Sequence, residues 1–172
     1  MVTRRFKRKV GGQVETAGNV LIVEDDNDIS QLLCKIASKS NYFPQPAYSV
    51  TEAMLYFRQQ EWDLVLLDLM LPGKTGEEVL SEIVNQSAVY VIIISAKGDQ
   101  QAKIDCLRTG AADYITKPFD IEEVSARLGS HLKRYKRSKT LSAPNDLIFK
   151  DLKIDLEAKT AVVNGFFVAD FS

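Results

Sequence analysis

Cysteine is scarce in this sequence. Its 172 residues include two cysteines, Cys34 and Cys106, which lie far apart in the chain and form no Cys-x-x-Cys pair. This usage excludes a disulfide-rich secreted domain and a zinc knuckle, and it favours a reducing compartment such as the cytoplasm. We expect both cysteines to be ordinary small apolar residues on helices. The single histidine, His131, is expected at the surface near a helix end.

Long apolar runs, a targeting segment and a charge excess are also missing. No stretch approaches the roughly 18–20 apolar residues that a membrane span needs. Residues 10–18 lack the apolar core of a secretory signal. The net charge of −1 favours neither nucleic acid nor membrane as a partner. We therefore expect a cytoplasmic protein without membrane contact.

The balanced charge conceals a basic start. Residues 1–18 contain five basic residues and one acidic residue, Glu15. Such a tail is typical of a nucleic-acid or membrane patch, but no amphipathic pattern accompanies it. We expect residues 1–18 to be a disordered basic extension or the product of a start codon placed too early.

The apolar residues that are present, 45% of the chain, fall into short continuous runs. The runs are 20–23, 64–67 and 89–94, with weaker candidates at 43–47 and 112–115. Continuous rather than alternating runs indicate strands that are buried on both faces. Trp62 is expected to pack at the start of the strand at 64–67.

Helical patterns separate these strands. Four of them cover 29–37, 77–84, 100–109 and 120 to about 134, and a fifth is opened by a capping box at Ser49–Glu52. Gly110 is placed to end the helix at 100–109. Five strands alternating with five helices predict an α/β fold, a five-stranded doubly wound parallel sheet with right-handed crossovers.

Ligands of such folds bind beyond the carboxyl ends of the strands. Four of the predicted strand ends carry chemistry-bearing residues: Glu24 with Asp25, then Asp68, Ser95 and Lys117. Each alone is most often a loop acid, a helix cap or a surface lysine, but together they are specific. Clustered carboxylates raise one another's pKa unless a cation such as Mg²⁺ compensates them. A carboxylate nucleophile beside a metal, an ammonium and a hydroxyl indicates phosphoryl transfer to an aspartate.

Four sequence blocks around these residues resemble the signature blocks of CheY-like receiver domains, in the form found in two-component response regulators of the OmpR/PhoB subfamily. The blocks are 20–26, 63–73, 94–97 and 110–119, and the resemblance covers about residues 19–134. It implies a protein that accepts a phosphoryl group on Asp68 from a sensor histidine kinase. It also implies no enzyme activity beyond the protein's own phosphorylation and dephosphorylation.

The resemblance implies a Mg²⁺ site. Asp25, Asp68 and the backbone carbonyl of Met70 would bind the metal, and Glu24 would act on it through water.

The resemblance also implies a switch. Ser95 would bond the phosphoryl oxygens, Lys117 would pair with their charge, and the rotamer of Tyr114 would follow Ser95. The Lys117–Pro118 peptide would be cis.

In the resembled subfamily, the face formed by the fourth helix, the fifth strand and the fifth helix changes on phosphorylation and dimerises through ion pairs. The matching residues here are Lys103, Asp113, Glu123 and Arg127. Ala112 stands where the subfamily usually has an aspartate opposite a basic residue such as Arg134, so a weaker dimer is expected. The alternative is a solvated helical face.

Residues 135–146 are polar and basic and indicate an interdomain linker. Strand-like runs follow at 147–149, 152–156 and 161–163, and Asn164-Gly165 favours a hairpin turn. Residues 147–172 resemble the antiparallel sheet that opens an OmpR-type winged-helix domain, so we expect a partial sheet of a truncated domain. The intact family regulates transcription, but without a recognition helix this chain is not expected to bind operator DNA specifically.

Other functions share part of the pattern. A haloacid-dehalogenase-type phosphatase requires a second aspartate where Met70 stands. A phosphate loop around Gly73-Lys74-Thr75 requires a glycine where Asp68 stands. The remaining alternative is a stand-alone receiver module that acts through protein contacts without DNA. The full set of acids, serine and lysine argues against a module that is not phosphorylated.

Overall fold

The computed structural model of the protein describes residues 18–141 continuously and six separate strands outside them, with side chains described for residues 18–134. The chain divides into two units, Met1–Leu132 and Lys133–Ser172, which are described separately. Among the described residues, no helix is both long enough and apolar enough to span a membrane.

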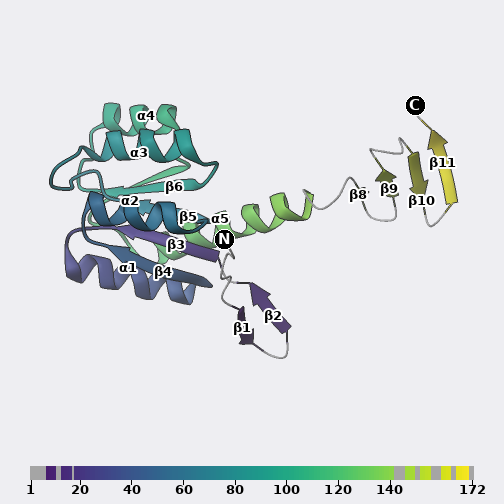
Figure 1. Ribbon diagram of the computed structural model, residues 1–172, viewed down its shortest axis with the longest axis horizontal. Helices are drawn as coiled ribbons and strands as arrows, with labels where there is room; N and C mark the ends of the chain where they lie inside the picture. The colour runs from purple at the N-terminus through teal and green to yellow at the C-terminus, as the bar shows by residue number, and fades with distance from the viewer. Residues whose placement is uncertain are drawn as a thin grey trace. The chain divides into compact units, whose positions relative to one another are not determined.

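The first unit contains a parallel five-stranded sheet (Figure 1). Its strands are β3 (Gly18–Val23), β4 (Tyr42–Ala47), β5 (Leu64–Leu67), β6 (Tyr90–Ser95) and β7 (Asp113–Thr116). They lie in the order β4-β3-β5-β6-β7, and each neighbouring pair is parallel. The chain direction across the sheet reverses between β3 and β5, where doubly wound folds bind ligands. The predicted α/β fold class is confirmed.

Five helices alternate with these strands. They are α1 (Asn27–Lys39), α2 (Val50–Gln59), α3 (Gly76–Gln86), α4 (Gln100–Thr109) and α5 (Ile121–Leu141). Ser49 caps α2 as predicted, although the Glu52 side chain accepts from the Tyr48 N–H rather than closing the box on Ser49. Gly110 ends α4 with φ of 126°, a conformation that favours glycine.

Both faces of the sheet are covered because alternate strand residues point to opposite sides. Leu21, Val65 and Ile93 belong to the cluster with α2, α3 and α4. Ile22, Leu66 and Ile92 belong to the cluster with α1 and α5. Figure 1 shows α2, α3 and α4 on one side of the sheet and α1 on the other. Trp62 is buried in the first cluster just before β5, as expected.

A close approach positions the loop that follows β5. A Cβ atom on Gly76, the first residue of α3, would lie 2.3 Å from the Leu69 Cα atom. The Gly76 N–H also donates to the Leu69 carbonyl at 3.2 Å. Only glycine fits there, so the start of α3 fixes the backbone directly after Asp68.

The expectation that His131 lies at the surface is wrong. Its exposed fraction is 5%, its ring centroid lies 5.7 Å from that of Tyr90, and its Nε2 lies 3.8 Å from Asp113 Oδ2. The reason is helical spacing. His131 falls on the same face of α5 as Val124 and Leu128, which pack against the sheet.

Helix α5 extends further than predicted. It continues to Leu141, into the stretch expected to be a linker. Lysine and arginine are good helix formers, and no glycine or proline interrupts residues 130–141.

Two short strands lie within the expected disordered extension. β1 (Lys7–Val10) pairs antiparallel with β2 (Gln13–Thr16). In the sequence a Gly-Gly pair separates them, and such a pair between two short runs is a hairpin signal.

The second unit contains an antiparallel sheet of four strands in the order β11-β10-β9-β8. The strands are β8 (Asp146–Phe149), β9 (Leu152–Asp155), β10 (Thr160–Val163) and β11 (Phe166–Asp170). The first three match the expected strands. The fourth, β11, was not among the predicted strands, although it lies directly after the Asn164-Gly165 hairpin signal.

Candidate functional site

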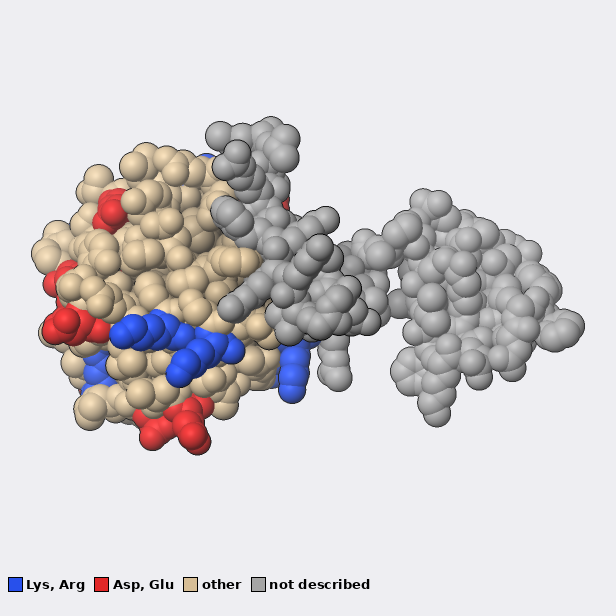
Figure 2. Space-filling model, turned by 90° about the horizontal axis from the view of Figure 1, so that it is seen from below, with Lys and Arg blue, Asp and Glu red and all other residues tan. Residues whose placement is uncertain are grey.

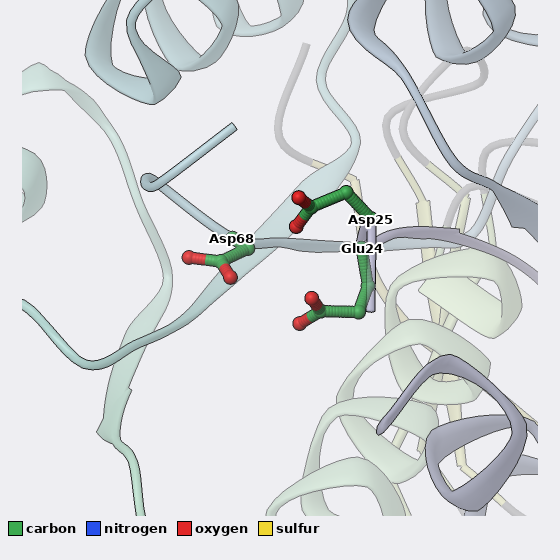
Figure 3. Close-up of side chains that lie close together, drawn as sticks. All are labelled: Glu24, Asp25 and Asp68. Carbon is green, nitrogen blue, oxygen red and sulfur yellow. The ribbon is translucent and has the colours of Figure 1, made fainter. Parts of the chain in front are cut away.

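Three carboxylates meet at the carboxyl ends of β3 and β5. Glu24 and Asp25 directly follow β3, and Asp68 directly follows β5, its neighbour in the sheet. One oxygen of each carboxylate lies within 4.8 Å of the others. Figure 3 shows the three side chains gathered on the same side of these strand ends. The structure thus brings together the three acids that the sequence singled out.

The Lys117 ammonium joins this cluster. It follows β7, and its Nζ lies 2.6 Å from Glu24 Oε2 and 2.6 Å from Asp68 Oδ2. Burial lowers the pKa of Lys117, but the hydrogen bonds to Asp68 and Glu24 raise it more, so the lysine stays protonated at neutral pH. The Lys117–Pro118 peptide is cis, as predicted.

The two adjacent acids differ in what their oxygens do. Glu24 is buried, with Oε1 accepting from the Asp26 N–H at 3.0 Å and Oε2 accepting from Lys117. Burial raises the pKa of Glu24 more than these hydrogen bonds lower it. Asp25 is exposed. Asp25 is therefore the acid with oxygens open to a ligand, whereas Glu24 already has a partner for each oxygen.

Asp68 is held in one orientation. Its Oδ1 accepts from the Met70 N–H at 2.9 Å, and its Oδ2 accepts from Lys117. The side chain is buried, with 5% of the residue exposed. Beside it, Met70 and Lys97 line an open hollow of about 610 Å³ between the loops that follow β5 and β6.

Ser95 and Tyr114 are hydrogen-bonded to each other through their side chains, and both bond the backbone of Lys97. Ser95, at the end of β6, is fully buried, and its Oγ accepts from the Lys97 N–H at 3.3 Å. The Tyr114 hydroxyl donates to the Lys97 carbonyl. Burial raises the pKa of Tyr114, so its hydroxyl keeps its proton. Both predicted switch residues therefore depend on the position of the loop after β6.

Comparison with known proteins gives the family. Residues 20–129 match the response regulator receiver domain. The chain belongs to this family.

Relatives of the receiver domain agree with the match. The transcriptional regulatory protein ResD of Bacillus subtilis (strain 168) is 33% identical over 150 residues, covering 85% of this chain and 62% of ResD. The solved receiver domain of the Francisella response regulator 1452 is 30% identical with a TM-score of 0.64, covering 70% of this chain and 98% of that one. The Thermotoga maritima response regulator DrrB, an OmpR/PhoB homologue, is 25% identical with a TM-score of 0.61, covering 89% of this chain and 66% of that one. The chain spans about three fifths of the length of its curated relatives.

The residues predicted to dimerise this receiver domain make contacts within the chain. Arg127 lies 2.7 Å from Asp113 Oδ2 and 2.9 Å from Glu123 Oε1. The Lys103 ammonium lies 5.8 Å from the centre of the Tyr114 ring. Dimerisation through these residues remains a prediction, in which Arg127 would exchange intrachain partners for partners on a second copy.

One ion pair near the site was not predicted. Lys97 Nζ lies 2.6 Å from Glu77 Oε1, which links the loop after β6 to the first turn of α3. Nothing in a single sequence pairs two charges that are 20 residues apart on different elements.

Proposed function

We propose that this receiver domain, spanning residues 19–134, accepts a phosphoryl group on Asp68 from a phosphohistidine of a sensor histidine kinase. The observation that carries the proposal is the position of Asp68 in one pocket with two further carboxylates and the Lys117 ammonium. Family membership supports it. The reaction would take place in the cytoplasm.

Asp68 is the nucleophile in this proposal. One carboxylate oxygen attacks phosphorus, an O–P bond forms and the N–P bond to the donor imidazole breaks. The electron pair of that bond stays on the imidazole nitrogen. The Met70 N–H donates to Asp68 Oδ1 and so holds the carboxylate in place. Lys117, now bonded to Asp68 Oδ2, would then pair with the phosphoryl oxygens.

The donor set fits Mg²⁺. All the available ligands are oxygens, which this hard cation prefers, and two carboxylates with a backbone carbonyl leave room for water. Asp25, Asp68 and the Met70 carbonyl would bind the ion directly, and Glu24 would act through water, as the resemblance to receiver domains implies. When bound, Mg²⁺ compensates the clustered negative charge and the charge of the transferring phosphoryl group.

Phosphorylation would change one face of the domain. The phosphoryl group adds about 1.5 to 2 negative charges, and Ser95 and Lys117 would gain contacts only in that state. Tyr114 and the Lys103, Asp113, Glu123 and Arg127 cluster lie on α4, β7 and α5. We propose that this face switches and forms a homodimer of the OmpR/PhoB type.

A role in transcription is proposed by analogy with ResD. The described residues beyond Leu141 all lie in strands. On the described surface that Figure 2 shows, a group of basic side chains lies between acidic ones.

Labelling tests the phosphorylation proposal. The protein is incubated with acetyl phosphate and Mg²⁺, and phosphorylation is measured by phosphate-affinity electrophoresis. We expect labelling of the wild type, none for Asp68→Asn, and normal labelling for the control Asp105→Asn, an exposed acid on α4. Labelling that persists in Asp68→Asn would contradict the assignment.

A further inference from the structure

Lys97 makes three connections at once. Its N–H donates to the Ser95 hydroxyl, its carbonyl accepts from the Tyr114 hydroxyl, and its ammonium lies 2.6 Å from Glu77 Oε1. The backbone of Lys97 therefore holds both predicted switch residues, while its side chain ties the same loop to α3.

The anchor point on α3 is firm. Glu77 lies in the first turn of this helix, and the following residues Val79, Leu80 and Ile83 are fully buried in the core. The loop after β6 is held less firmly, because residues 96–100, which include Lys97, are exposed. Movement of the loop would stretch the Lys97–Glu77 pair rather than displace the helix.

The ion pair is charged at neutral pH. Burial raises the pKa of Glu77, but the hydrogen bond from Lys97, the hydrogen bond from its own backbone and the nearby Lys97 charge together lower it more. The same bond to Glu77 raises the pKa of Lys97. The side chains are 46% and 38% exposed, so the pair has the modest strength of a surface ion pair.

A shift of Ser95 toward a phosphoryl group on Asp68 would either break the bond that its hydroxyl accepts from the Lys97 N–H or move the loop with it. We propose that the Lys97–Glu77 ion pair is a latch that holds the loop after β6, and with it Ser95 and Tyr114, in the unphosphorylated arrangement. The proposal rests on the proposed phosphorylation of Asp68. Breaking the latch raises the affinity for a phosphoryl group by the free energy that the pair contributes to the unphosphorylated state alone.

A second ion pair provides a matched control. Lys74 Nζ lies 3.0 Å from Glu82 Oε2, also joins a loop beside the site to α3, and its side chain is 56% exposed. Among the hydrogen bonds of the described residues, those of Ser95 and Tyr114 involve Lys97 and not Lys74. Loss of this pair changes the local charge similarly without releasing the switch residues.

Beryllofluoride in the presence of Mg²⁺ mimics a phosphoryl group on aspartate and tests the latch. Its half-saturating concentration is measured by amide NMR for the wild type, Glu77→Gln, Lys97→Gln, the double variant and Lys74→Gln. We expect a two- to fivefold lower concentration for each single latch variant, the range that an exposed ion pair supplies. The double variant should gain no more than either single one, because both remove the same interaction. Lys74→Gln should match the wild type.

Glu77→Gln and Lys97→Gln together distinguish a latch from direct attraction between the lysine and the bound anion. A lysine that simply attracts the anion predicts weaker binding for Lys97→Gln, which would overturn the proposal, as would an unchanged Glu77→Gln. Hydrogen exchange of the backbone amide at position 97, measured without beryllofluoride and corrected for the intrinsic rate of the residue there, should be faster in both latch variants than in the wild type. Wild-type protein that neither binds beryllofluoride nor is labelled would contradict the function of Asp68 instead, because the exchange measurement does not need that function.

Discussion

The residues inside the strands and the residues at their carboxyl ends are both buried, but burial affects the stability of the fold differently at the two places. Val20, Leu66 and Ile93 are apolar and at most 1% exposed, so burial stabilises them. Glu24, Asp68 and Ser95 are polar and at most 5% exposed, so burial has a cost that their hydrogen bonds and Lys117 offset. The fold is stabilised by the interiors, whereas the ends carry charge that a stable fold does not need. Substitutions inside the strands should therefore change mainly stability, and substitutions at the carboxyl ends mainly function.

The largest effect is expected in a strand interior. Ile93→Ala removes a side chain that is fully buried in the cluster with α2, α3 and α4, and it should lower the free energy of unfolding by about 2–5 kcal/mol. Urea denaturation measures the change. Ile121→Ala is the matched control, because Ile121 is 52% exposed and its loss should change stability little. An equal decrease in the free energy of unfolding of both variants would contradict the claim that burial inside the sheet stabilises the fold.

A smaller loss is expected for Lys117→Met at the carboxyl ends. The change leaves two buried carboxylates without their ammonium and should cost about 3 kcal/mol, the lower end for a broken buried pair because 14% of the lysine side chain is exposed. Thermal unfolding without Mg²⁺ gives the value. Lys74→Met, which breaks an exposed pair, should cost less than about 1 kcal/mol. Equal stability of Lys117→Met and wild type would mean that the site does not need this charge.

The smallest effect, and the one of opposite sign, is expected for Asp68→Asn. Removing one of three clustered negative charges relieves repulsion while labelling is lost, so stability should stay equal or rise by up to about 1 kcal/mol. Asp63→Asn at the other end of β5 should instead lose about 1 kcal/mol, because Asp63 accepts from the Asn19 N–H at 2.7 Å. Chemical denaturation of both variants, again without Mg²⁺, compares the two ends of one strand. A large loss for Asp68→Asn would make Asp68 a structural residue.

The sequence predicted the parallel sheet because its signal is local. Runs such as 64–67 are continuous and apolar, and their carboxyl ends must share one edge of the sheet. That topology predicts the convergence of Glu24, Asp25 and Asp68. It also predicts that Lys117 lies at the same edge, because it comes directly after β7, which is two strands away from β5 in the sheet. The capping box at Thr75–Glu78 has the same pattern as the one recognised at Ser49 and could have placed the start of α3 correctly.

Other features depend on packing that no local pattern shows. Residue type alone predicts a surface position for His131, but its position on α5 places it among buried residues. The pair of Lys97 with Glu77 depends on how one loop lies against a helix, which a single sequence does not specify. The roles of Ser95 and Tyr114 require a second state of the molecule and remain predictions.

The most direct test of the central claim locates the phosphorylated residue itself. The phosphorylated protein is trapped by borohydride reduction of the acyl phosphate, and the modified residue is identified by peptide mass spectrometry. The account predicts modification of Asp68 alone. Modification of Asp25, or of an acid outside this pocket, would contradict it.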